Sequence, residues 1–133
     1  MRFILTALLI LAGMVFTGIG IGFLLNPANS AVGFGLEAID PSGLAALRAD
    51  FTAFFVVAGV CMIWGGWRRN GDVLLIPAAL FAIAITGRIV SIVGDGTVEG
   101  FWLPMLVEAA SVALCLVGNR LLPHRDSIVP APL

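Results

Sequence analysis

Two ionisable side chains, Arg88 and Glu108, lie well inside long apolar runs of this 133-residue chain. An ionised guanidinium in hydrocarbon costs at least about 2.5–3.5 kcal/mol on insertion scales, and arginine does not escape that cost by losing its proton. Arg88 therefore needs an acidic partner or water. Its apolar run begins at Val73 and contains no acidic residue before Asp95. We predict that Arg88 pairs with Glu108.

The composition is that of a membrane protein. Hydrophobic residues make up 60% of the chain, charged residues 11%, and the mean hydropathy is +1.10. A soluble domain has about a quarter charged residues. The net charge of −1 and the lack of a basic patch exclude nucleic acid as a partner, because nothing would neutralise its phosphates.

The hydropathy pattern predicts an all-α protein, an integral membrane four-helix bundle in a single domain over residues 1–133. A helix needs about 20 apolar residues to cross a bilayer. The expected spans are, in chain order, residues 3–25, 44–67, 73–93 and 101–122. A signal peptide is the alternative for the first, but its apolar region exceeds the usual limit of about 15 residues, so we expect a retained helix. The two later connections are short, which makes neighbouring spans antiparallel.

Two local signals refine this picture. Asp40-Pro41-Ser42-Gly43 is typical of a turn, with Ser42 as a candidate N-cap for the second span. In the first span, Gly18 and Gly22 have the four-residue spacing that lets membrane helices approach closely. We expect this glycine face to be available for a homodimer.

The arginines predict the orientation in the membrane. With the N-terminus inside, Arg48 is the arginine of the outer loops, where it stands among acidic residues. Apart from Arg88, the remaining arginines then lie in the cytoplasmic segments or at the cytoplasmic end of the last span: Arg2, Arg68, Arg69, Arg120 and Arg125. Cytoplasmic loops carry such an excess of positive charge. Both termini are therefore expected in the cytoplasm.

The spacing also predicts further polar neighbours for the pair. At 1.5 Å per residue, Arg88 lies about 7–8 Å and Glu108 about 9 Å below the outer surface, so the two arrive at one level. Ser91 and Asp95 follow Arg88 on the same helical face, and Ser111 follows Glu108 by one turn. The full predicted cluster consists of Arg48, Arg88, Ser91, Asp95, Glu108 and Ser111.

Three interpretations of this cluster remain open. Arg88 and Glu108 could hold the helices in register, although polar contacts between membrane helices average well under 2 kcal/mol. They could line a pocket open to the outer surface, because ionisable residues inside membranes usually mark substrate or ion pathways. Arg88 could also extend to the interface and meet a lipid phosphate.

No sequence signature of an enzyme or a metal site is present. The chain contains no GxSxG, HExxH, P-loop or CxxC pattern, and no nucleophile with a neighbouring base is visible. Cys61 and Cys115 lie in apolar runs without the spacing of a redox or metal motif. His124 has no second ligand in its polar tail. We predict no cofactor and no metal.

Three groups of residues together resemble a known family. They are Arg48 at the start of the second span, Gly87-Arg88-Ile89-Val90-Ser91 with Asp95-Gly96 in the third, and Glu108 in the fourth. This pattern resembles a bacterial family of uncharacterised four-helix membrane proteins grouped with the DoxX-like proteins. The resemblance implies a bundle in the bacterial inner membrane with these polar positions as its site. Some DoxX relatives are membrane subunits of sulfur-compound:quinone oxidoreductases, but this chain has no redox cysteine pair.

The leading functional hypothesis is non-enzymatic. We expect the Arg–Glu cluster, in the outer half of the bundle, to bind an amphipathic or lipid-like ligand from the bilayer, or to dock in a larger membrane complex. The alternative is a proton-coupled transporter or a quinone-reactive oxidoreductase subunit. Four spans are few for a transporter, so that role would need a homodimer.

The orientation is testable by cysteine-accessibility labelling in intact cells. Cysteines placed near Asn70 and Ile128 should react only with reagents that reach the cytoplasm, and a cysteine near Thr97 should react from outside. Labelling of position 97 from the cytoplasm alone would overturn the orientation.

Overall fold

The computed structural model describes residues 2–97 and 99–124, and within them it contains helices and turns but no strand. The elements are α1 (Arg2–Leu25), α2 (Pro27–Val32), α3 (Pro41–Ala46), the π-helical turn η1 (Leu47–Phe51), α4 (Thr52–Trp67), the 3-10 turn η2 (Asp72–Leu74), α5 (Leu75–Asp95) and α6 (Trp102–Leu121). The all-α prediction is confirmed. Arg125 and Ile128, which entered the orientation prediction and its test, lie outside the described residues.

Four stretches are long and apolar enough to cross a membrane, as predicted: Arg2–Leu25, Pro41–Trp67, Asp72–Asp95 and Trp102–Leu121. The second consists of α3, η1 and α4 in direct succession. Length and composition together indicate an integral membrane protein. Which side of the membrane holds the termini stays a prediction.

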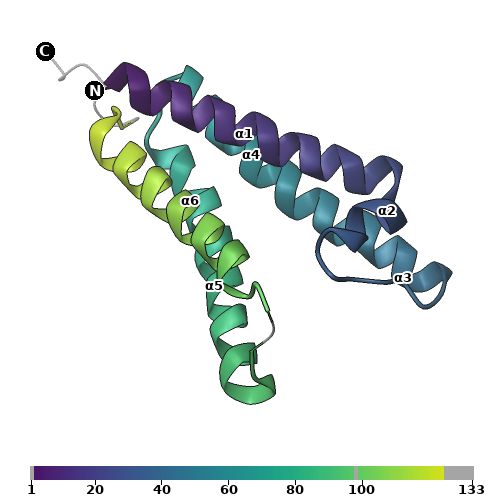
Figure 1. The fold of residues 1–133 in the computed structure, drawn as a ribbon. Coiled ribbons are helices and arrows are strands. Elements are labelled where there is room, and N and C mark those ends of the chain that lie inside the picture. Colours follow the sequence, from purple (N-terminus) through teal and green to yellow (C-terminus); the bar gives the residue numbers. More distant parts are fainter. Residues whose placement is uncertain (1, 98, 125–133) are drawn as a thin grey trace, which may run out of the picture.

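The four spanning helices form two antiparallel hairpins that meet at one end and diverge toward the other (Figure 1). α1 lies along α4, and α5 lies along α6. The end where the hairpins meet, here called the base, holds the start of α1, the end of α4, the start of α5 and the end of α6. α2 and α3 lie at the far tip of one hairpin, and the α5–α6 turn lies at the far tip of the other.

Glycines allow α1 and α4 to touch backbone to backbone. A Cβ added to Gly13 would lie 2.6 Å from the carbonyl oxygen of Gly59, and a Cβ on Gly59 would lie 2.6 Å from that of Gly13. Close approach through small residues is how membrane helices gain packing energy where lipid tails are as apolar as the side chains. By contrast, nothing lies within 4 Å of a Cβ on Gly18, and Gly22 faces the Ser30 hydroxyl of α2.

Leu74 joins the two hairpins at the base. Its side chain is fully buried. A Cβ on Gly65 of α4 or on Gly118 of α6 would lie 2.5 Å from one of its methyl groups. Leu9 of α1 approaches the same point of Gly118, at 3.2 Å. One leucine therefore occupies space that two glycines leave open.

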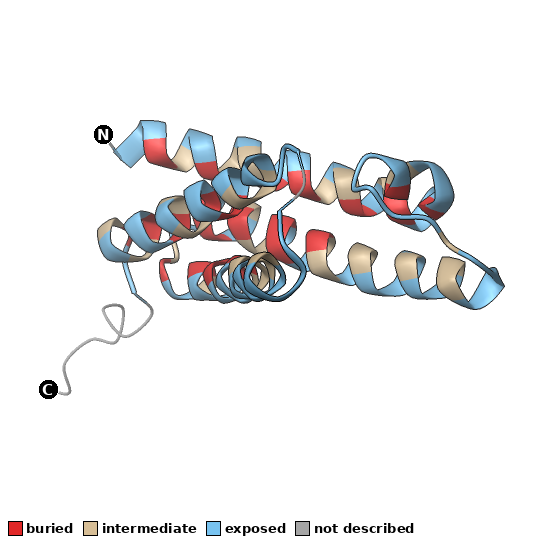
Figure 2. Ribbon diagram, turned by 60° about the horizontal axis from the view of Figure 1, so that its bottom comes forward, coloured by how far each residue is buried: buried red, intermediate tan, exposed pale blue. Residues whose placement is uncertain are grey.

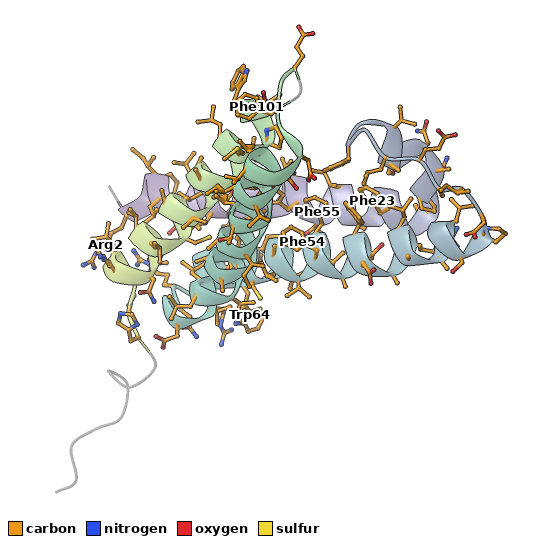
Figure 3. All side chains as sticks on the ribbon, turned by 90° about the horizontal axis from the view of Figure 1, so that it is seen from below. Arg2, Phe23, Phe54, Phe55, Trp64 and Phe101 are labelled. Atoms are coloured by element: carbon orange, nitrogen blue, oxygen red, sulfur yellow. The ribbon has the colours of Figure 1, made fainter. Side chains whose placement is uncertain are left out.

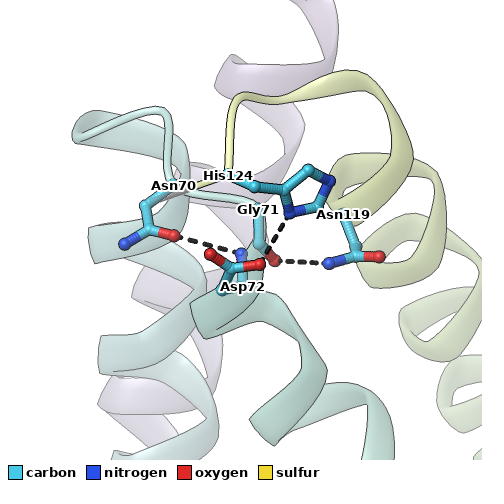
Figure 4. Close-up of polar contacts among 5 residues, drawn as sticks. All are labelled: Asn70, Gly71, Asp72, Asn119 and His124. Atoms are coloured by element: carbon cyan, nitrogen blue, oxygen red, sulfur yellow. Dashed lines mark hydrogen bonds and ion pairs between the residues drawn. The ribbon is translucent and has the colours of Figure 1, made fainter. Parts of the chain in front are cut away.

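Polar contacts close to Leu74 join the connection between α4 and α5 to the end of α6 and the residues after it (Figure 4). The Asn119 amide nitrogen donates to the Gly71 carbonyl at 3.0 Å, and the Asp72 backbone N–H donates to the Asn70 side chain at 3.1 Å. His124 Nδ1 lies 2.6 Å from Asp72 Oδ1. His124, whose side chain is 45% exposed, thereby contacts the turn that begins the third span.

Phe81 marks where the hairpins separate. Its ring centroid lies 4.7 Å from that of Phe16 in α1 and 5.5 Å from that of Phe54 in α4. The aromatic contacts continue along the α1/α4 hairpin through Phe23 and Phe55, which lie where these two helices meet (Figure 3). No residue of α5 after Phe81 is buried, and the buried positions concentrate at the base and between α1 and α4 (Figure 2).

The second span begins one turn earlier than predicted because Asp40, not Ser42, is the N-cap. The Asp40 carboxylate accepts a hydrogen bond of 2.8 Å from the Gly43 backbone N–H, with Pro41 at the first helical position. Proline suits that position because the missing N–H would be unpaired there anyway.

The glycine contact predicts an asymmetric response to added methyl groups. Gly59→Ala should destabilise the protein by about 1–3 kcal/mol, because the methyl forces two backbones apart. Gly18→Ala should be neutral or slightly stabilising, because the position is open and alanine favours helix. Circular dichroism during sodium dodecyl sulfate titration of mixed micelles measures both. Equal losses would contradict the packing.

Candidate functional site: the Arg88–Glu108 pair

Arg88 of α5 and Glu108 of α6 form the predicted ion pair. The Arg88 Nε donates to Glu108 Oε1 at 2.8 Å, the distance expected of a charge-assisted hydrogen bond. The two helices are antiparallel neighbours joined by a short turn, so equal distances from the turn place both side chains at one level. The predicted contact is confirmed.

The pair is unevenly buried and incompletely hydrogen-bonded. The Glu108 side chain is 11% exposed, whereas that of Arg88 is 40% exposed. Glu108 Oε2 is buried and has no hydrogen-bond partner within the described residues. A guanidinium has five N–H donors, and the bond to Glu108 uses the one on Nε. The part of the pair open to its surroundings is therefore Arg88, with four N–H donors that Glu108 does not use, whereas the unpaired acceptor is covered by the protein.

Helical phase places the pair on the side of the α5/α6 hairpin that faces α1 and α4. Arg88 follows Phe81 by seven residues, a spacing that rotates a side chain by only about 20°. Phe81 contacts α1 and α4. Glu108 precedes the fully buried Cys115 by the same seven residues. We call this side, beyond Phe81, the inward face.

The predicted serine and aspartate neighbours do not complete the pair. Ser111 is buried, and its hydroxyl donates to the Val107 carbonyl of its own helix at 2.8 Å. Ser91 and Asp95 are exposed on α5, and neither makes a side-chain hydrogen bond to another described residue. All three residues lie near the pair in sequence, but none of them forms a side-chain hydrogen bond with Arg88 or Glu108.

Arg48, the remaining predicted member, lies elsewhere. It belongs to η1, and its Nε donates to the Leu24 carbonyl at the end of α1, at 3.1 Å. It thus satisfies one of the carbonyls that every helix leaves unpaired at its C-terminus. The tip holding α3 lies far from the α5–α6 tip (Figure 1). The divergence of the hairpins separates Arg48 from Arg88.

Sequence reasoning also missed a hollow of about 410 Å³ at the tip of the α1/α4 hairpin. Its walls are apolar side chains of the α2–α3 connection and η1, such as Leu36 and Phe51, with the carboxylates of Glu37, Asp40 and Asp50. None of the six predicted site residues lines it. The residues that line this hollow come largely from an irregular connection. Irregular segments have no sequence periodicity from which such a surface could be predicted.

The pair supplies charged hydrogen-bonding groups. Cys61 and Cys115 are free thiols. Across residues 2–97 and 99–124, no group of three or more candidate ligands could hold a metal ion. Charged and polar groups here can orient a head group by hydrogen bonds.

Fold and site together define a helical membrane protein of four spanning helices that contains the Arg88–Glu108 ion pair. The family model of a domain of unknown function, DUF4345, matches residues 4–118, so the chain belongs to that family. No curated protein and no solved structure matches the chain. The kinship with DoxX-like proteins stays a prediction.

Removing one charge should cost more than removing both. Glu108→Gln leaves Arg88 uncompensated, a loss of roughly 3–5 kcal/mol for fully buried pairs in soluble proteins, reduced here because Arg88 is 40% exposed. The double change Arg88→Met with Glu108→Leu leaves no charge and should be less destabilising. Detergent unfolding compares them, with exposed Glu99→Gln as the control. A double variant less stable than Glu108→Gln would contradict the argument.

Proposed function

We propose that the protein is a binding protein of the bacterial inner membrane that takes up an amphipathic, lipid-like ligand at the Arg88–Glu108 pair. The observation that carries the proposal is the Arg88 side chain, which is 40% exposed and uses only its Nε in the bond to Glu108. The terminal nitrogens of Arg88 carry four further N–H groups, which can donate to a ligand head group that approaches from the uncovered side.

The surroundings of the pair suit an amphiphile. Ile85 and Ile92 lie three residues before and four residues after Arg88, on the same helical face, and are partly buried. Beyond Phe81 no residue of α5 is buried, so no other helix covers the inward face there. Sites for small molecules are mostly apolar with a few convergent polar groups. An acyl chain along the isoleucines with its head at Arg88 meets that description.

Docking in a larger membrane complex is the second candidate, because a partner helix could cover the same uncovered inward face. It requires a stoichiometric partner in mild detergent, which a lipid-binding protein does not. A proton-coupled transporter or a quinone-reactive DoxX-like subunit rests on the sequence alone. The transporter requires flux in proteoliposomes that Glu108→Gln abolishes, and a homodimer through α1.

Ligand retention tests the proposal. The full chain, purified from bacterial membranes in mild detergent, should carry a bound amphiphile at one per chain by native mass spectrometry. The double variant Arg88→Met with Glu108→Leu should lose it, because both polar contacts are gone while the packing volume is kept. Arg120→Met, which removes an exposed arginine at the base, should retain it. Equal retention in all three proteins would refute binding at the pair.

A further inference from the structure

We propose that the base of the protein binds the phosphate group of an anionic phospholipid through four arginines, Arg2, Arg68, Arg69 and Arg120. This site lies apart from the ion pair between α5 and α6 and does not depend on the function proposed for that pair. Three features of the structure support it: contacts that gather the arginines, positive charge that no carboxylate neutralises, and a local geometry that holds two of them at the membrane surface.

Contacts at the base bring the arginine-bearing segments together. The connection after α4 is bonded to the end of α6, because the Asn119 amide nitrogen donates to the Gly71 carbonyl at 3.0 Å. Arg69 lies two residues before Gly71, and Arg120 directly follows Asn119. One hydrogen bond therefore places the connection that carries Arg69 beside the turn of α6 that carries Arg120.

Arg2 reaches the same level from α1. The Thr6 carbonyl oxygen lies 3.3 Å from the point where a Cβ on Gly66 of α4 would be. Because α1 and α4 run antiparallel, the helical turn from Thr6 back to Arg2, about 5 Å long, leads past the end of α4. Arg2 thus lies at the level of the connection after α4, at the same end of the molecule as Trp64 (Figure 3).

The base carries an excess of positive charge. Its described residues include four arginines and one carboxylate, Asp72, which leaves a net charge of +3 with His124 neutral. His124 Nδ1 lies 2.6 Å from the Asp72 carboxylate, so this acid already has a partner. In residues 2–97 and 99–124, none of the four guanidiniums forms an ion pair, and all four arginines are exposed. Arginine clusters beside a membrane span attract anionic lipids.

Arg68 is held at the level of lipid head groups. Its Cζ lies 5.4 Å from the centroid of the Trp64 ring, within the range of a cation–π contact. Trp64 is 53% exposed, and tryptophan side chains concentrate at the boundary between membrane and water. A guanidinium that rests on an interfacial indole lies where lipid phosphates are, which favours a phospholipid over a phosphate dissolved in water.

Arg69 occupies a backbone position that usually belongs to glycine. α4 ends in a Schellman motif, in which the Asn70 N–H donates to the Gly65 carbonyl at 3.0 Å and the Arg69 N–H donates to the Gly66 carbonyl at 3.4 Å. Arg69 has a φ of 52°, in the left-handed region where a Cβ is costly and glycine is preferred. Its guanidinium gains no ion pair in return, so a phosphate ligand would account for an arginine here.

Two lipids with the same fluorescent acyl chain test the proposal. Phosphatidylglycerol carries one net negative charge, whereas the choline of phosphatidylcholine cancels the charge of the same phosphate. Each is titrated with delipidated full-chain protein in detergent, and fluorescence anisotropy measures binding. Phosphatidylglycerol should bind about fivefold or more tightly, and salt on the order of 1 M, with a Debye length of about 3 Å, should remove the difference. Glycerophosphoglycerol, the same head group without acyl chains, should not displace the lipid.

Arg69→Gly separates recognition from folding. The variant should bind phosphatidylglycerol about fivefold more weakly, because an arginine near anionic lipid contributes about that factor. It should resist detergent unfolding at least as well as the unaltered protein, because glycine suits the left-handed position. Arg69→Lys keeps the charge and should keep the preference for phosphatidylglycerol. The double change Arg88→Met with Glu108→Leu, which leaves the base intact, should bind this lipid as the unaltered protein does.

Four results would overturn the proposal. Equal binding of the two lipids would show that charge does not select the ligand. Unchanged binding by Arg69→Gly, or lost binding in the double change at Arg88 and Glu108, would show that the lipid does not bind at the base. Displacement by glycerophosphoglycerol would assign the site to a soluble phosphate compound. None of these results decides whether an amphiphile binds at the ion pair, which the double variant tests separately.

Discussion

The arrangement of this protein depends on the contact of one side chain, Leu74, with two glycines. Gly65 and Gly118 each leave a space that a methyl group of Leu74 fills, 2.5 Å from where a Cβ would lie. Together with the Asn119–Gly71 hydrogen bond, this contact anchors one hairpin to the other at the base. Phe81 extends the contact by two turns. Beyond it the hairpins are free to diverge, which leaves the inward face uncovered.

The ion pair is independent of that anchorage. Its two partners come from helices joined by a short turn, so the α5/α6 hairpin can form the contact without the other half of the molecule. The packing at the base instead determines how far the pair lies from α1 and α4. A more closed base would seal Arg88 against α1 and α4, whereas the observed one leaves its side chain 40% exposed. The anchorage thus controls access to the site, and the hairpin supplies its chemistry.

The contrast between contacts within a hairpin and packing between hairpins explains which features could be predicted from the sequence. Span positions and the Arg88–Glu108 contact follow from hydropathy and turn length, which are local properties, and both were predicted correctly. The place of Arg48 depends on the angle between hairpins, which no local pattern contains. The packing glycines, Gly13 and Gly59, depend on how α1 and α4 are rotated about their axes, which the spacing of Gly18 and Gly22 does not reveal. The Asp40 cap was within reach, because an aspartate before a helix-starting proline is itself a signal.

Of the three interpretations of Arg88, the geometry speaks against a side chain that meets lipid alone. Its Nε lies 2.8 Å from Glu108 Oε1, so part of the guanidinium is bound within the protein. As a purely structural contact, the pair contributes on the order of 1 kcal/mol, the average for polar contacts between membrane helices. Leaving Glu108 Oε2 buried without a donor costs about 1–3 kcal/mol. The two quantities cancel or leave a net loss, so stability alone does not account for two charges in the apolar part of a spanning hairpin. The part of the pair that a ligand can reach is the Arg88 side chain, 40% exposed with its terminal N–H groups unused by Glu108, and this favours recognition as the role of the pair.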